Sequence, residues 1–356
     1  MNKNEAKMLQ GISVIFMVCV HLFCRLNWAE LYATPIMLFG LPVSFYIGQI
    51  GDFCIITYII CSSYSQMNTH GKEHYYRRRL VSLLVLYGRF WLILILFTIV
   101  APIAGRSDMF QNDVFGYFLS YTGYWNCYNG AWWYLPIYAV FVIFSPLTVR
   151  FCQKRHWLLI SVIIAVLYVV GYYFRFNRIY EFNFYFNTSR IGVFSMTFAE
   201  YLFGLLLCKL QFFEKAKAIA EKIKPVWYWL VSAVIVVGIT FVRAQYVRSM
   251  FVAPGVALVF TTIFLAGKKP KFVCDFFLFF GNHSTNIWLT HMFFYHTLFV
   301  NFVFVAKYPL FIFLFMMMIC VALSYALDFL YKPIMKKILL LNLPREERKE
   351  KNVVKL

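Results

Sequence analysis

A small set of ionisable side chains interrupts otherwise apolar runs, and these residues are the first candidates for chemistry. They are His21, Asp52, Arg89, Glu200, His291, His296 and Asp328. Ionisable groups inside apolar segments are costly, so they are usually functional or paired. His21 lies in the run Val-Cys-Val-His-Leu-Phe-Cys, where a neutral imidazole can take a proton from a hydroxyl group. The pattern predicts a general base, and the alternative is a core histidine hydrogen-bonded to a neighbouring helix.

His291 ends the stretch Gly-Asn-His-Ser-Thr-Asn-Ile-Trp-Leu-Thr-His, which is unusually polar for the start of an apolar helix. Two interpretations stand side by side: a polar lining that faces a cavity, or a capped helix start. His296 lies one residue beyond the i+4 spacing from His291, so the two rings do not share a helix face well.

Glu200 and Arg89 each lie well inside an apolar run. A mutual ion pair is the structural interpretation of these two residues, and Glu200 is also a candidate for binding an acceptor substrate. Asp52 and Asp328 are expected near water, and neither is assigned a role.

The cluster Tyr75-Tyr76-Arg77-Arg78-Arg79 precedes a long apolar run. Such clusters usually set membrane orientation beside anionic headgroups. Guanidinium groups also grip phosphate oxygens, so Arg77, Arg78 and Arg79 are candidates for binding a phosphorylated co-substrate.

The run Asn-Gly-Ala-Trp-Trp-Tyr-Leu-Pro, residues 129–136, opens another apolar segment. Paired tryptophans at such a position usually form an interfacial aromatic belt. Trp132 and Trp133 are also candidates for stacking on a sugar face.

The composition indicates that the chain carrying these residues is a membrane protein. The 356-residue chain is 62% hydrophobic and 14% charged, against about 45–50% and about 25% for average soluble domains. Its mean hydropathy of +0.68 excludes a disordered chain and a secreted disulfide scaffold, and long unbroken apolar runs exclude a β-barrel. No cysteine spacing matches a metal site, so no metal is expected.

Hydropathy predicts an all-α, polytopic transmembrane bundle of about ten spans. The predicted spans are Met8–Cys24, Leu41–Tyr64, Leu80–Ala104, Trp132–Val149, Trp157–Phe174, Ile191–Cys208, Val226–Val242, Met250–Ala266, Asn286–Val305 and Tyr308–Tyr331. Most of the 34 Lys and Arg residues then fall on one side, which places both termini in the cytoplasm. The first span is expected to be retained as an anchor and not cleaved as a signal peptide.

Residues 1–341 are predicted to form one integral membrane domain, and residues 342–356 a charged, disordered cytoplasmic tail. The net charge of +19 is explained by the membrane-orienting loops, so the lipid bilayer and not a nucleic acid is the expected partner.

Taken together, these segments resemble acyltransferase family 3, a family of multi-span bacterial enzymes that O-acylate cell-surface glycans. The resemblance covers nearly the whole chain and rests on separated stretches in the family's order. They are Leu9-Gln10-Gly11-Ile12-Ser13 through His21, then Ser62-Ser63-Tyr64, Arg77-Arg78-Arg79, Trp133-Tyr134-Leu135, Ser145-Pro146-Leu147, and finally Gly281-Asn282-His283-Ser284 through His291.

This chain departs from the family pattern at four positions. Gln10 stands where the family has Arg or Lys, and Lys7 is the nearest basic residue. Ser63 replaces the glycine of a Ser-Gly-aromatic turn, Ser82 replaces a second arginine after Arg79, and Ile56 replaces an acid.

The resemblance implies a membrane O-acyltransferase, most simply an O-acetyltransferase, in the bacterial inner or plasma membrane. The expected donor is cytoplasmic acyl-CoA, in the first instance acetyl-CoA, and the expected acceptor is a hydroxyl of a polysaccharide or lipid-linked sugar of the cell envelope. His21 is then the base. His291, Ser284 and Gln10 are unranked candidates for stabilising the oxyanion, and Lys7 and Gln10 are expected to assist the arginines with the donor.

Trp132, Trp133, Ser284 and Glu200 are expected on the acceptor side. The alternative function is a glycan transporter or polymerase-like membrane protein without acyl transfer.

Overall fold

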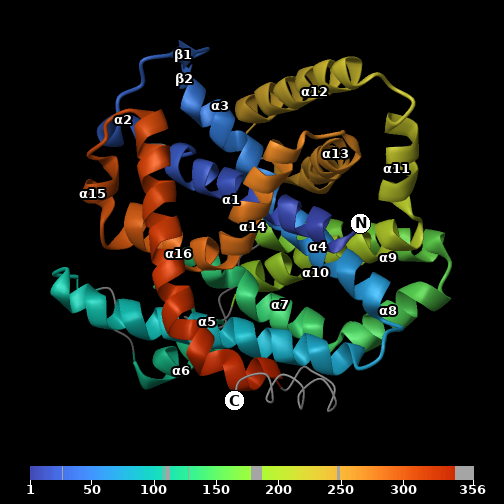
Figure 1. Cartoon of the computed structure of the whole chain (residues 1–356), viewed down its shortest axis with the longest axis horizontal. Helices are drawn as coiled ribbons and strands as arrows, with labels where there is room; N and C mark the ends of the chain where they lie inside the picture. The colour runs from blue at the N-terminus through green and yellow to red at the C-terminus, as the bar shows by residue number, and fades with distance from the viewer. Residues whose placement is uncertain are drawn as a thin grey trace. The chain divides into compact units, whose positions relative to one another are not determined.

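The computed structural model describes residues 1–25, 27–106, 108, 113–126, 128–177, 187–246 and 249–340 (Figure 1). The chain divides into two compact units, each built from three segments and each described here by itself. The first unit comprises Met1–Asn68, Leu147–Thr285 and Asn301–Met317, and the second comprises Thr69–Pro146, Asn286–Val300 and Met318–Leu356.

The first unit is helical apart from one small hairpin. Its elements are α1 (Lys3–Phe23), α2 (Trp28–Leu31), β1 (Met37–Leu38), β2 (Leu41–Pro42), α3 (Val43–Gln49), α4 (Cys54–Thr69), most of α8 (Ser145–Lys154), α9 (Trp157–Phe176), α10 (Thr188–Lys209), α11 (Phe212–Ala220), α12 (Pro225–Gln245), α13 (Ala253–Ala266), the first part of α14 (Lys271–Met292), α15 (Val300–Phe304) and the first turns of α16 (Pro309–Leu340). The two strands pair antiparallel, with Leu38 opposite Leu41.

The described part of the second unit contains five helices or parts of helices around one aromatic core. They are α5 (Tyr75–Ile103), α6 (Val114–Thr122), α7 (Tyr134–Ile143) and the later parts of α14 and α16. Phe90 and Phe97 of α5 pack against Trp132 and Phe293 in this core, and all four side chains are buried. Their burial helps to hold α5 against the turn that follows α14.

Local sequence signals set where several helices begin. Asn2 and Glu5 form a reciprocal capping box at the start of α1, which satisfies two backbone N–H groups that would otherwise lack partners. The side chains of Asp113 and Asn187 cap α6 and α10 in the same sense. Pro225 opens α12, where its missing N–H is no loss.

The predicted helical membrane class is confirmed, while the predicted count of ten spans is not confirmed. Within the described residues, seven helices are long and apolar enough to cross a membrane. An eighth span is added if the pair Gly130–Ile143 and Ser145–Lys154, bent by 64°, counts as one. The predicted span Met250–Ala266 is a shorter apolar helix. The cytoplasmic placement of both termini stays a prediction.

The predicted span Asn286–Val305 is wrong as a single helix. Asn286 to Met292 are the last turns of α14, which begins at Lys271, and a π-helical turn (Phe293–Thr297) and the separate α15 follow. No proline breaks the chain between Lys271 and Met292, so the helix continues through the polar run that hydropathy interprets as a boundary. The run that ends at His291 is therefore helix interior, and the capped-start interpretation is wrong.

The predicted tail, residues 342–356, lies outside the described residues. The boundary of a membrane domain at residue 341 stays a prediction.

Candidate functional site

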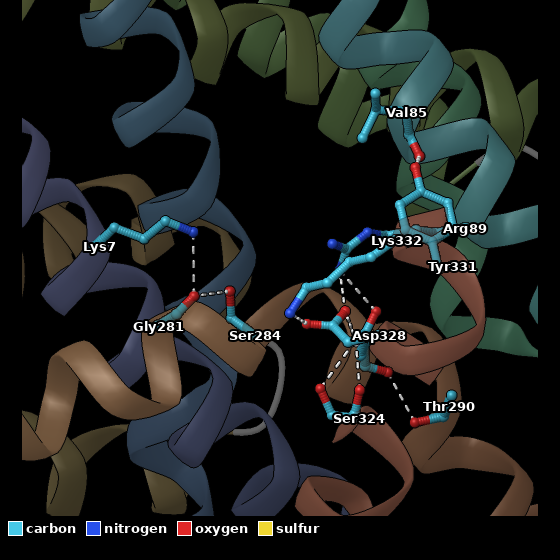
Figure 2. A network of polar contacts seen from close by, with 11 residues as sticks. Lys7, Val85, Arg89, Gly281, Ser284, Thr290, Ser324, Asp328, Tyr331 and Lys332 are labelled. Atoms are coloured by element: carbon cyan, nitrogen blue, oxygen red, sulfur yellow. Dashed lines mark hydrogen bonds and ion pairs between the residues drawn. The ribbon is translucent and has the colours of Figure 1, made fainter. Parts of the chain in front are cut away.

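In the first unit, α1, α4 and α14 bring together polar groups that lie far apart in the sequence. The Lys7 ammonium group donates to the Gly281 carbonyl at 3.3 Å, and the Ser284 hydroxyl donates to the same carbonyl at 2.8 Å (Figure 2). The Tyr58 hydroxyl donates to the Gln10 carbonyl at 3.0 Å and lies beside the Ser284 hydroxyl. Three predicted site residues, Lys7, Gln10 and Ser284, thus belong to one cluster.

Two glycines allow this cluster to form. A Cβ atom at Gly11 would lie 2.0 Å from the Phe277 carbonyl oxygen, and one at Gly281 would lie 2.1 Å from the Lys7 carbonyl oxygen. The backbones of α1 and α14 therefore touch directly, as small residues permit between membrane helices. Both glycines belong to the stretches that carry the family resemblance, and the structure shows why glycine is needed there: any side chain would collide with the facing backbone.

A third close crossing involves one of the departures from the family pattern. Ser63 of α4 stands where the family has glycine, and its hydroxyl donates to the Ile59 carbonyl at 2.9 Å. A Cβ atom at Gly204 of α10 would lie 1.9 Å from the Ser63 hydroxyl oxygen. The serine is accommodated because the facing residue is glycine.

His21 lies in the last turn of α1 and is half-buried. It is 14 residues beyond Lys7, close to four helical turns, so the two side chains share a face of α1 about 21 Å apart along the axis. The structure therefore places the predicted base and the polar cluster on one face of the helix but at different depths.

In the second unit, the three arginines occupy the first turns of α5. Arg77 and Arg78 are exposed and Arg79 is half-buried, with its guanidinium donating to the Thr69 hydroxyl at 2.7 Å. His74, the residue before the helix, has left-handed backbone angles and makes no side-chain cap. The helix start thus combines backbone N–H groups without a side-chain cap and three cations, which suits a phosphate group.

A second polar network lies deeper along α5. Arg89 donates to the Asn286 side-chain oxygen at 3.0 Å and lies 3.3 Å from an Asp328 carboxylate oxygen (Figure 2). Asn286 in turn donates to that carboxylate at 3.1 Å and to the Ser324 hydroxyl at 2.9 Å. Lys332 lies 3.3 Å from the second carboxylate oxygen.

The predicted ion pair between Arg89 and Glu200 is wrong, because Arg89 pairs with Asp328 instead. Glu200 is buried in α10, and Arg175 of α9 is the cation that interacts with it electrostatically. Asp52, expected near water, pairs with the buried Arg243. Arg89 and Asp52 thus each have an ion-pair partner within their own unit, which offsets part of the penalty of burial.

His291 is fully buried in the last turn of α14. Its Nδ1 atom lies 2.9 Å from the Trp288 carbonyl oxygen and 3.1 Å from the Ile287 carbonyl oxygen. Carbonyl oxygens only accept, so Nδ1 carries the proton and a neutral ring has its lone pair on Nε2. As a neutral ring, His291 can accept a proton at Nε2, and it can donate to an oxyanion there only when protonated.

Side chains from the 129–132 segment fix the backbone just before His291. Asn129 and the indole of Trp132 both donate to the Leu289 carbonyl at 3.0 Å, and Trp288 donates to the Ala131 carbonyl at 2.9 Å. Trp132 is 1% exposed, so it packs in the core and presents no face to a sugar. Trp133 is half-buried, and sugar stacking stays a prediction for that residue.

Sequence reasoning missed Tyr58 and Asn286 and gave Asp328 no role. Asp328 carried the available signal, an acid in an apolar run. Tyr58 gives no such signal in a chain this rich in aromatic residues, and Asn286 stood out only as part of the polar stretch that ends at His291. In the described part of the chain, no three His, Cys, Asp or Glu side chains gather closely enough to hold a metal ion.

Comparison with known families agrees with the sequence resemblance. A model of the acyltransferase domain, that of acyltransferase family 3, matches residues 4–329. The search of curated proteins found no match, and neither did the search of solved structures. The family match favours the acyltransferase prediction over the transporter alternative. With nearly the whole chain matched and several helices able to span a bilayer, this protein belongs to acyltransferase family 3 and is a multi-pass membrane acyltransferase.

Proposed function

We propose that the protein moves an acyl group, in the first instance acetyl, from cytoplasmic acyl-CoA to a hydroxyl of a cell-surface glycan or its lipid-linked precursor. The observation that carries the proposal is the start of α5, where three consecutive arginines meet a helix N-terminus that no side chain caps. Coenzyme A carries phosphate groups, and this arrangement binds phosphate through both bidentate guanidinium contacts and backbone N–H groups.

The chemistry needs one base and one oxyanion donor. His21 removes the proton from the acceptor hydroxyl, and the oxygen attacks the thioester carbonyl carbon. The carbon–sulfur bond then breaks, the ester remains on the glycan, and the thiolate leaves as CoA and takes up the proton that His21 holds. General-base assistance of this kind contributes about 10²–10⁴-fold.

The place of His21 in α1 suits this role. The carbonyl groups at a helix C-terminus carry partial negative charge and stabilise a cation nearby. His21 lies in that last turn, so the imidazolium formed during proton transfer is stabilised where it appears.

The oxyanion donor is a choice among three groups. The Ser284 hydroxyl donates a hydrogen bond to the Gly281 carbonyl in this structure. A protonated His291 can donate from Nε2. The Gln10 side chain is the third candidate. Replacing each in turn separates them, because loss of an oxyanion donor lowers kcat by about 10²–10³-fold.

The test is His21→Ala in a deletion strain, with acetyl groups on the surface glycan measured by mass spectrometry. The exposed His296 gives a matched control, His296→Ala, and membrane protein levels are compared for both. We expect acetylation to be lost with His21→Ala and kept with His296→Ala. Full acetylation by the His21 variant at normal protein level contradicts the base assignment.

Donor binding is tested separately on the purified protein. Changing Arg77, Arg78 and Arg79 together to Gln is expected to abolish acyl-CoA binding. Changing Lys215, Lys222 and Lys224 to Gln removes the same charge from the segment between α10 and α12 and is expected to leave binding intact. Equal binding by both variants would show that the arginines do not hold the donor.

A further inference from the structure

The helix α7 runs beside only one half of α5. At one end, the Tyr76 hydroxyl in the first turn of α5 donates to the carbonyl of Ile143, the last residue of α7, at 3.2 Å. At the other end, the Trp132 ring, just before α7, packs against Phe90 with ring centroids 4.8 Å apart. The two helices are therefore antiparallel, and α7 covers about 21 Å of the roughly 43 Å length of α5. Because α5 is long and apolar enough to cross a membrane, α7 spans only about half of that distance.

The helix α6 ends near the same point of α5 (Figure 1). The Trp91 indole donates to the Tyr121 carbonyl at 2.8 Å, and the Tyr87 hydroxyl donates to the Thr122 carbonyl at 2.9 Å. Tyr121 and Thr122 are the last two residues of α6. Since α5 continues to Ile103, about 18 Å beyond Trp91, the chain returns from the end of α5 to its middle before α7 begins.

The end of α6 satisfies its carbonyl groups without water. The last four C=O groups of an α-helix have no partner within the helix. In addition to the two bonds from α5, the Thr122 hydroxyl donates to the Leu119 carbonyl at 2.7 Å, and the Gly123 N–H donates to the Ser120 carbonyl at 3.0 Å. All four terminal carbonyls of α6 are thus paired with protein donors. A helix end in water does not need this, whereas a helix end in hydrocarbon does.

The exposed side of α6 is apolar, as is the neighbouring half of α5. The helix α6 has no charged residue, and Val114 and Phe118 are its most exposed side chains. Exposed isoleucines on α5 follow Trp91 at intervals of four residues: Ile95, Ile99 and Ile103. The hydrogen bond from Trp91 to α6 joins the two surfaces. A helix that is apolar on its exposed side as well as its buried side is suited to lipid and not to water.

We propose that α6 lies inside the bilayer, with Val114 and Phe118 against phospholipid acyl chains. The helices α6 and α7 are then the two halves of one membrane crossing, broken between Thr122 and Gly130 near the bilayer middle. In this arrangement α6, and not α8, supplies the second half of the crossing that α7 begins. The inference concerns membrane depth alone, so it does not depend on the proposed acyl transfer.

The break lies against the last turn of α14. Asn129 and the Trp132 indole, both at the break, donate to the Leu289 carbonyl, two residues before His291. In secondary transporters, discontinuous helices of this kind typically form polar sites near the bilayer middle. The broken crossing thus gives a physical reason for a polar segment beside His291 at this depth.

The experiment measures the depth of Phe118 in the full-length protein, reconstituted in lipid nanodiscs. Phe118→p-acetylphenylalanine keeps the aromatic ring and provides a ketone for a nitroxide label, so the native cysteines stay unchanged. The same label at Ile99, Ile103 and Lys222 gives references for the bilayer interior, the end of α5 and water. We expect the ratio of oxygen to nickel-chelate accessibility at Phe118 to equal or exceed that at Ile99. It should exceed that at Lys222 at least about tenfold, because a polar chelate is excluded from hydrocarbon.

A charge substitution tests the same depth without a label. Phe118→Lys is expected to lower the yield of folded protein in the membrane about fivefold or more, because a lysine there would lie in hydrocarbon. Ile219→Lys is the matched control, since α11 is also a short helix and Ile219 is 64% exposed against 65% for Phe118. The helix α11 carries Glu214, Lys215 and Lys217, so this control is expected to keep its yield.

Three results would overturn the proposal. An accessibility ratio at Phe118 equal to that at Lys222 would place α6 in water. A ratio between those at Ile103 and Lys222 would place α6 flat among the headgroups, with no broken crossing. Equal yields of Phe118→Lys and Ile219→Lys would also contradict insertion. If Phe118→Lys fails to fold, the label on Phe118 still reports the depth of α6 in the folded protein.

Discussion

A single methyl group at Gly281 should separate two helices that carry the polar cluster. The added Cβ would lie 2.1 Å from the Lys7 carbonyl oxygen, and real contacts of this type stay above 3.0 Å. The helices α1 and α14 must therefore part by about 0.9 Å there. The Lys7 ammonium group already donates to Gly281 at 3.3 Å, so this movement takes the pair beyond hydrogen-bond distance.

Three effects of Gly281→Ala on the free energy of unfolding can be compared. Overpacking costs about 1–3 kcal/mol, and the lost hydrogen bond about 0.5–1.5 kcal/mol. Alanine is favoured over glycine inside a helix by about 1 kcal/mol. The expected net loss for Gly281→Ala is about 1–3 kcal/mol of unfolding free energy, with a further loss of acyl transfer because Lys7 and Ser284 no longer share the Gly281 carbonyl.

The assay is unfolding of the purified protein in detergent, followed by tryptophan fluorescence, together with acyl transfer from acyl-CoA at matched protein level. Gly238→Ala is the matched control, since Gly238 lies inside α12 and a Cβ there would meet nothing within 4 Å. We expect this control to be as stable as the parent or slightly more stable. If Gly281→Ala unfolds like Gly238→Ala and keeps full activity, the direct backbone contact is refuted.

Three further predictions concern other contacts. Asp328→Ala should lower the free energy of unfolding by about 3 kcal/mol, because it leaves Arg89 without its carboxylate partner. The double variant with Arg89→Leu and Asp328→Leu should lose less stability than Asp328→Ala. A double variant less stable than either single variant in the same unfolding assay would contradict this. Gly204→Ala should be destabilising alone but nearly neutral with Ser63→Gly, because the added methyl group meets the Ser63 hydroxyl; additive losses in a double-variant cycle would show that the two residues are not coupled. Trp132→Phe should lower the free energy of unfolding by about 1 kcal/mol through the lost hydrogen bond to the Leu289 carbonyl, and should leave the KM for the acceptor unchanged. Trp133→Ala should raise the KM for the acceptor with little effect on stability. The reverse pattern would exchange the roles of the two tryptophans.

The sequence by itself determined the helical membrane class and most of the helices. Long apolar runs with few charges leave only helices able to satisfy the backbone in lipid, and this argument needs no partner residue. The resemblance to acyltransferase family 3 pointed to Lys7, Gln10 and Ser284, which the structure brings into one cluster, and their role stays a prediction.

Hydropathy was less reliable at Asn286–Val305, where it took a polar stretch for a boundary. The helix from Lys271 continues through that stretch, because hydrogen bonding along a helix depends on backbone geometry and not on side-chain polarity. The polar residues are satisfied by partners on other helices, as Asn286 is by Ser324 and Asp328.

Only the tertiary structure decided which groups meet. Arg89 pairs with Asp328 and not with Glu200, and Gly11 and Gly281 place the backbones of α1 and α14 in contact. Partners separated by more than two hundred residues leave no local pattern, since helix packing and not chain order brings them together. The same holds for the apolar cavity of about 390 Å³ that α1, α3, the segment before the hairpin and the start of α16 enclose in the first unit, because none of these segments describes that space alone.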